Sequence, residues 1–165
     1  MTIIVKNKET LLFDEFKFKC SVGKKGFTRN KKEGDLKTPA GIFELGKIYY
    51  RPDRIEKPLS KLQTTTIKKN MGWCDDPKSK YYNKLIKIKK NFKINHEKLY
   101  RKDNKYDIFI LIKHNYKKVI KNQGSAIFLH LTKNYLPTKG CVALSKKDFL
   151  ILIKLINKKT KIRIT

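Results

Sequence analysis

The chain has 165 residues, 39% of them hydrophobic, which is enough for one domain with its own core. This composition argues against a disordered chain, and no apolar run reaches the roughly 18 to 20 residues that a membrane-spanning helix needs. With 41 basic and 14 acidic residues the formal net charge is +27, so the surface should attract polyanions. We expect a single domain over residues 1–165.

Most of the positive charge comes from lysine, which is spread from Lys6 to Lys161, whereas only five residues are arginine. A protein that reads nucleic acid more often concentrates arginine, because its planar guanidinium suits phosphate and guanine. The diffuse pattern therefore favours a compositional bias over a dedicated polyanion site. A basic nucleic-acid-binding module without catalysis stays open as an alternative function.

The first part of the chain reads as strands joined by turns. Apolar and polar residues alternate over 16–22 (FKFKCSV), the pattern of a half-buried strand, and the glycines of 23–26 favour a turn after it. The segment 38–41 (TPAG) predicts another turn, because proline fixes one dihedral angle and glycine permits positive φ. Residues 42–48 then read as the next strand.

Residues 51–83 read as a long connection rather than regular structure, because prolines and turn residues interrupt them. Trp73 lies in this connection, where it either anchors the loop to the body or lines a pocket. Of the three cysteines, Cys20 falls on the apolar side of an alternating strand and is expected in the core. The role of Cys74 stays open. The cysteines are too far apart in sequence for a structural zinc site.

The C-terminal part combines short apolar runs with one helical pattern. The runs 107–112 and 125–130 have the length and composition of buried strands. Ser145 resembles a helix N-cap, and apolar residues at helical spacing predict a helix over 146–157. Ile162 and Ile164 predict a closing strand. The sequence as a whole indicates a mainly β fold.

A histidine and a cysteine lie eleven residues apart at the ends of two of these apolar runs. The first run ends at His130, and Gly140 comes directly before Cys141, which begins the next run. Strands that end at one rim of a sheet can place an imidazole beside a thiol, as nucleophilic catalysis requires. Taken alone, the pair is also compatible with a buried structural cysteine, because free cysteine is among the most buried residue types.

The functional interpretation depends on the state of the thiol. A free thiol is mostly protonated at neutral pH, and a neighbouring imidazole that accepts its proton would keep Cys141 as a thiolate. The positive charge of Lys139 next to it is expected to lower the pKa of the thiol further. Gly140 would let the backbone approach a substrate carbonyl, so that amide N–H groups of Gly140 and Cys141 stabilise an oxyanion.

The segments GDLKTPAGIFELG and IFLH…PTKGCVALS, taken together, resemble the YkuD-type L,D-transpeptidase catalytic domain. His130 matches the strand histidine of that family, and Thr138–Cys141 match its signature of Ser/Thr, any residue, Gly and the nucleophilic Cys. The upstream segment 38–41 matches its Thr-Pro-x-Gly turn. Lys139 differs from the histidine common in wall cross-linking members, and Val142 follows the cysteine where those members carry Arg or Asn.

The resemblance implies a β-sandwich or β-barrel with one or two short helices. It also implies a cysteine-dependent acyltransferase that acts on peptidoglycan stem peptides through a thioester on Cys141. His130 would be the base, oriented by a backbone carbonyl, and no metal or organic cofactor would be needed. A carboxypeptidase (hydrolase) of the same family remains an alternative outcome.

Thr138 and Lys139 lie in the matched signature, His114 follows the 107–112 strand near the same sheet rim, and Trp73 is an aromatic residue that could line a pocket. We expect these four residues to contact substrate. The expected partners are stem peptides and anionic wall polymers, and the expected state is a monomer without an integral membrane segment. The family implies the cell envelope or periplasm. The N-terminal residues MTIIVKNKE do not show the pattern of a secretory signal peptide.

Overall fold

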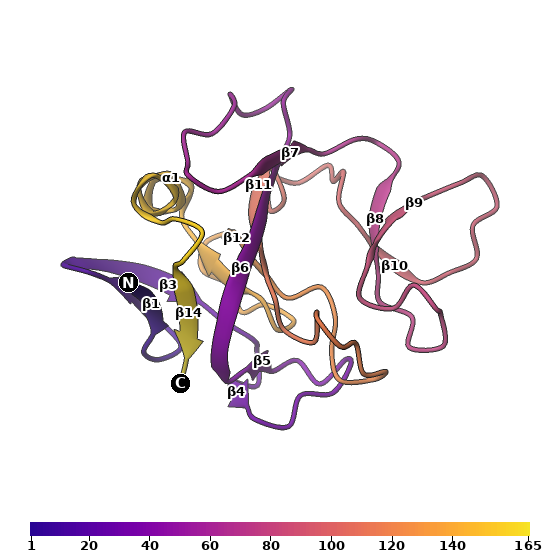
Figure 1. Cartoon of the computed structure of the whole chain (residues 1–165), viewed down its shortest axis with the longest axis horizontal. Coiled ribbons are helices and arrows are strands. Elements are labelled where there is room, and N and C mark those ends of the chain that lie inside the picture. Colours follow the sequence, from indigo (N-terminus) through magenta and orange to yellow (C-terminus); the bar gives the residue numbers. More distant parts are fainter.

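The computed structural model describes all residues from 1 to 165 and contains fourteen strands and one helix (Figure 1). The elements are β1 (Thr2–Val5), β2 (Thr10–Phe13), β3 (Phe16–Ser21), β4 (Phe27–Thr28), β5 (Thr38–Pro39), β6 (Gly41–Tyr50), β7 (Thr64–Thr66), β8 (Met71–Cys74), β9 (Leu85–Lys87), β10 (His96–Lys98), β11 (Ile108–Ile112), β12 (Phe128–Leu131), β13 (Val142–Leu144), α1 (Lys146–Leu155) and β14 (Lys161–Ile164).

Eight strands close into a barrel. Their order is β11-β12-β13-β3-β2-β1-β14-β6, and β6 also pairs with β11, which removes the free edges of the sheet. The first and last strands, β1 and β14, pair in parallel, so both ends of the chain belong to the same sheet. β7 pairs in parallel with residues 48–50 of β6 and adds a ninth strand to the sheet. The mainly β fold expected from the sequence is confirmed.

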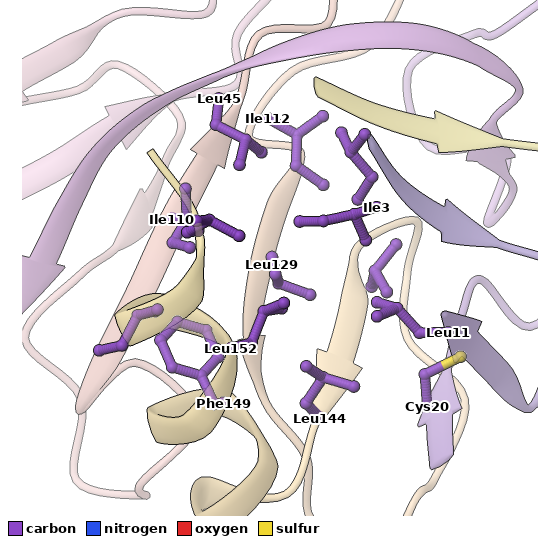
Figure 2. Close-up of a cluster of buried hydrophobic side chains, with 14 of the residues drawn as sticks. Ile3, Leu11, Cys20, Leu45, Ile110, Ile112, Leu129, Leu144, Phe149 and Leu152 are labelled. Atoms are coloured by element: carbon purple, nitrogen blue, oxygen red, sulfur yellow. The ribbon is translucent and has the colours of Figure 1, made fainter. Parts of the chain in front are cut away.

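The inside of the barrel is filled by a cluster of 26 buried residues, most of them aliphatic. Alternate residues of each strand supply it, for example Leu129 and Leu131 of β12 and Val142 of β13. Phe149 and Leu152 of α1 complete it, and Figure 2 shows them beside the strand residues. We call this group the inner cluster.

The helix begins where the sequence predicts. Ser145 is its N-cap, and the hydroxyl of Ser145 accepts a hydrogen bond from the backbone N–H of Asp148 at 3.1 Å. The helix ends at Leu155, two residues earlier than the predicted Asn157, because Ile156 adopts extended backbone (φ −80°, ψ 159°). The chain can therefore turn towards β14 at this point.

A second cluster of nine buried residues lies on the outer side of the same strands, and we call it the outer cluster. Its members are Tyr49, Ile67, Trp73, Leu99, Tyr106, Phe109, Leu111, Phe128 and Cys141. Because side chains alternate along a strand, Phe128 faces outwards between the inward-facing Ile127 and Leu129. Its ring packs 4.5 Å from that of Phe109 and 5.3 Å from that of Trp73, centroid to centroid.

The expectation of an irregular connection over residues 51–83 is wrong in part. This region contains β7 and β8, and β8 is the middle strand of a three-stranded sheet in the order β10-β8-β9. The partners of β8 lie after residue 83 and are largely polar, so local hydrophobic alternation does not reveal them. Trp73 of β8 is 1% exposed and anchors this small sheet to the barrel through Phe128.

Candidate active site

The strands β12 and β13 bring Cys141 and His130 to one side of the barrel wall. They pair in parallel, with His130 opposite Ala143 and Leu129 opposite Val142. Cys141, which directly precedes β13, therefore stands level with Phe128, two residues before His130. Cys141 and His130 are therefore diagonal neighbours across the pair, on the same face of it. Both residues line one pocket of about 440 Å³.

The thiol of Cys141 is held by two backbone groups. It donates a hydrogen bond to the carbonyl of Ala126 (3.2 Å) and accepts one from the N–H of Phe128 (3.3 Å). Burial raises the pKa of the Cys141 thiol to about 12. The expectation that His130 and Lys139 keep the sulfur as a thiolate is therefore wrong, because the raised pKa leaves the thiol protonated at neutral pH.

His130 is 5% exposed and held in one orientation. Its Nδ1 lies 2.8 Å from the carbonyl oxygen of Leu131, and because a carbonyl only accepts, Nδ1 carries the proton and Nε2 presents a lone pair. Burial lowers the pKa of His130 to about 4. The ring of Tyr106 packs edge-on against the imidazole, with centroids 5.4 Å apart. The predicted orientation by a backbone carbonyl is confirmed.

The turn before Cys141 is closed by Thr138. The Thr138 hydroxyl donates to the carbonyl of Cys141 (2.6 Å) and accepts from the N–H of Gly140 (3.1 Å). Gly140 has φ +148°, and a Cβ there would lie 2.9 Å from the carbonyl oxygen of Lys37, so the turn requires glycine. The Gly140 N–H, expected to serve an oxyanion, is engaged by the Thr138 hydroxyl inside the turn. Lys139 is exposed at the pocket edge.

The two motifs noted in the sequence meet at Gly23. The backbone N–H of Gly23 donates to the hydroxyl of Thr38 at 2.8 Å, and Gly23 forms a β-bridge with Thr138. A side chain at Gly23 would collide with the carbonyl oxygen of Leu36, 2.6 Å away. The upstream turn therefore supports the turn that carries Cys141.

Charged side chains of both signs surround the candidate pair, and local sequence reasoning missed them. They are Lys31, Glu33, Asp75, Glu97, Arg101 and Lys105. Glu33 accepts hydrogen bonds from the hydroxyls of Tyr82 and Ser125. One carboxylate oxygen of Asp75 is buried without a partner, and burial, then Glu97 and Glu33, raise the pKa of Asp75. These residues come from distant loops, and no local pattern marks them.

His114 and Trp73, two of the expected substrate contacts, do not line this pocket. The Nε2 of His114 lies 2.7 Å from the carbonyl oxygen of Gln123, and burial lowers the pKa of His114. Trp73 lines a separate pocket of about 790 Å³ and donates its indole N–H to Asn83. Neither residue lines the pocket of Cys141, although Trp73 packs with Cys141 in the outer cluster.

The other two cysteines are also buried, and all three are free thiols. Cys20 lies in the inner cluster, as predicted. No group of three or more His, Cys, Asp or Glu side chains is arranged to hold a metal ion. The single helix, α1, lacks the length and apolar character that crossing a bilayer would demand.

Comparison with known proteins gives one family. The family model of the L,D-transpeptidase catalytic domain, YkuD, matches residues 1–164, which is nearly the whole chain. No curated protein and no solved structure matches the chain. The match covers both strands that carry the candidate pair and the upstream turn that supports them. The chain therefore belongs to the YkuD family of L,D-transpeptidase catalytic domains.

Proposed function

We propose that this chain is a cysteine-dependent acyltransferase that acts on peptidoglycan stem peptides through a thioester on Cys141. The observation that carries the proposal is the placement of Cys141 and His130 as diagonal neighbours on one face of β12 and β13, lining one pocket. Family membership supplies the substrate class, because L,D-transpeptidases act on cell-wall peptides.

In the first half-reaction, Nε2 of His130 takes the proton of the Cys141 thiol as sulfur bonds to the carbonyl carbon of an L-residue in the stem. The tetrahedral intermediate then collapses. The bond to the following D-residue breaks, and the imidazolium returns its proton to the departing amine. The stem remains bound to Cys141 as a thioester.

In the second half-reaction an amine of another stem attacks the thioester carbon. His130 accepts the proton that this amine loses and returns it to the sulfur as the thiol leaves. Water in place of the amine would give a shortened stem, which is the carboxypeptidase outcome. The two outcomes differ only in the acceptor that reaches the thioester.

The Cys141 thiol and the His130 imidazole both start neutral, which constrains the first step. The pKa of Cys141 is raised by burial and that of His130 is lowered by burial, so charge separation between the two side chains is unfavourable. The proton must therefore move together with bond formation to the substrate carbonyl, when the negative charge passes to oxygen.

The mixed charge of the pocket supports a substrate with both carboxylates and an amine. Lys105 and Lys139 face the same space as Glu33 and Asp75. A stem peptide with a diamino acid carries both kinds of group. We infer that such a stem is the donor, and that the protein acts in the cell envelope, where its substrate lies.

Defined muropeptides, separated and identified by mass spectrometry after incubation, test the proposal. Cross-linked dimers with release of a terminal D-residue indicate transfer, and shortened stems alone indicate hydrolysis. Cys141→Ala should form neither product. Equal product formation by Cys141→Ala and the unmodified protein would refute the assignment of the nucleophile.

A further inference from the structure

Asn83 is a buried polar residue that the reaction described above does not use. Its side chain is 2% exposed, and its backbone has φ +56°. The side-chain oxygen accepts from the indole N–H of Trp73 (2.8 Å) and from the backbone N–H of Ala126 (3.1 Å). The side-chain amide donates to the carbonyls of His114 (3.1 Å) and Asn115 (2.7 Å). All four hydrogen-bonding positions of the amide are therefore satisfied.

One of these bonds reaches the segment that holds the candidate nucleophile. Ala126 has φ +51°, a left-handed conformation that is costly for any residue with a side chain. The carbonyl of Ala126 is the acceptor for the Cys141 thiol at 3.2 Å. Asn83 is thus hydrogen-bonded to the N–H of Ala126, and the carbonyl of Ala126 is hydrogen-bonded to the Cys141 thiol.

Relaxation of Ala126 would move this carbonyl. A residue that leaves the left-handed region rotates its peptide planes, and the bond between Asn83 and the Ala126 N–H opposes that rotation. We propose that Asn83 is a positioning residue for the nucleophile: it fixes Ala126 in the left-handed conformation, so that the Ala126 carbonyl holds the Cys141 thiol protonated and in place until substrate binds. This inference rests on the proposed function only for the role of Cys141 in turnover.

The physical effect has a definite direction. A carbonyl that accepts the S–H proton stabilises the neutral thiol, whereas the N–H of Phe128 favours the thiolate. If the Ala126 carbonyl is lost as an acceptor, the Phe128 N–H remains, and it favours the thiolate form of Cys141. The sulfur would become easier to ionise but less well placed for attack on a substrate carbonyl.

The charged groups around Cys141 stay in place in such a variant. Glu97 opposes ionisation of the thiol, and Lys31 and Lys105 favour it. His130 and Tyr106 line the same pocket. None of these five side chains is hydrogen-bonded to Asn83. A change in the titration of Cys141 in an Asn83 variant would therefore not come from a lost hydrogen bond to any of them.

The test follows the alkylation of Cys141 by iodoacetamide from pH 6 to 10.5, with the modified site mapped by mass spectrometry. In the unmodified protein the rate should rise about tenfold per pH unit without a plateau, as for a thiol with a high pKa. In Asn83→Ala a plateau should appear within this range, and turnover of stem peptide should fall about tenfold or more. Water entering the space left by Asn83 would also lower the pKa of the thiol, because burial raises it. Asn83→Leu, which fills that space without an acceptor, is therefore compared, and the proposal predicts the plateau there as well.

Asn115→Ala is the matched control. Asn115 is another left-handed asparagine, and its side chain holds Ile120 and Gly124 in the same loop, but it makes no side-chain bond to Ala126. Its alkylation profile should match that of the unmodified protein. A plateau in Asn115→Ala as well, or an unchanged profile in folded Asn83→Ala, would overturn the proposal.

Asn83→Asp keeps the test decisive if Asn83→Ala does not fold. Aspartic acid at this position retains an oxygen that accepts from Ala126 and Trp73 in either protonation state. The proposal predicts an alkylation profile without a plateau in this variant, and a plateau would contradict it. Alkylation needs no substrate, so these outcomes do not depend on whether peptidoglycan is the substrate. Failure of the proposed function would appear separately, as absence of muropeptide products in the unmodified protein.

Discussion

The inner and outer sides of the barrel wall differ in composition and in use, although the same strands supply both. Four of the 26 residues in the inner cluster are aromatic, against five of the nine in the outer cluster. Leu129 and Leu131 of β12 point inwards, whereas His130 between them faces the pocket. One strand therefore contributes to stability and to the candidate chemistry through alternate residues, and the two contributions can be tested separately.

The largest effect should come from the outer side. Cys141→Ala should abolish turnover, because no other thiol lines the pocket, while the loss of one sulfur atom should change the free energy of unfolding by about 1 kcal/mol. Turnover of a stem peptide and urea unfolding measure the two quantities. A variant that keeps activity, or that no longer folds, would contradict the separation of the two sides.

His130→Ala should reduce turnover by on the order of 10²-fold or more, through loss of the group that carries the proton. The losses in a double variant with Cys141→Ser should not add, because both residues serve one step. Kinetics of the two single variants and the double variant provide the measurement. A double variant much slower than either single variant would mean that the residues act independently.

Leu129→Ala tests the inner side. It removes a fully buried aliphatic side chain next to His130, and should lower the free energy of unfolding by about 2–5 kcal/mol. Turnover per folded molecule should stay within a few-fold of that of the unmodified protein, because the side chain points away from the pocket. Urea unfolding together with turnover at low temperature measures both. A loss of turnover comparable to that of His130→Ala would contradict the separate contributions of the inner and outer sides.

The pH dependence of stability should also come from the outer side. The pKa of His130 is about 4 in the folded protein, below its ordinary value of about 6.5 in the unfolded chain. The unfolded chain therefore binds more protons between these values, and stability is full above pH 6.5 and falls as the pH drops towards 4. The contribution is at most about 3 kcal/mol. In His130→Gln, the free energy of unfolding measured with urea should fall less between pH 6.5 and pH 4 than in the unmodified protein. An equal fall in both proteins would contradict the burial argument.

The smallest effect on turnover should come from salt. The pocket of about 790 Å³ is lined by five lysines, two of which pair with Glu44, whereas the pocket of Cys141 is lined by side chains of both signs. Binding to wall sacculi should therefore weaken steeply between low and physiological salt, because exposed charges are screened within about 8 to 10 Å. Turnover of a small stem peptide should change far less. If both fell in parallel, exposed lysines such as Lys139 would have to take part in the reaction.

The sequence predicted the inner side better than the outer side. Alternation and helical spacing record burial against a core, so the strand at residues 16–22 and the start of α1 follow from local pattern. Cys141 and His130 were found as a motif. Asn83 was not, because its hydrogen bonds join segments far apart in the chain. The protonation of the thiol also escaped prediction, because it depends on burial, which local sequence does not give.

The central claim is that Cys141 carries the acyl group between the two half-reactions. Intact-protein mass spectrometry after rapid mixing with a defined tetrapeptide stem tests it most directly. We predict an adduct with the mass of the stem without its terminal D-residue, mapped to Cys141 and absent in Cys141→Ala. Turnover without any adduct on Cys141, or an adduct that persists in Cys141→Ala, would contradict it.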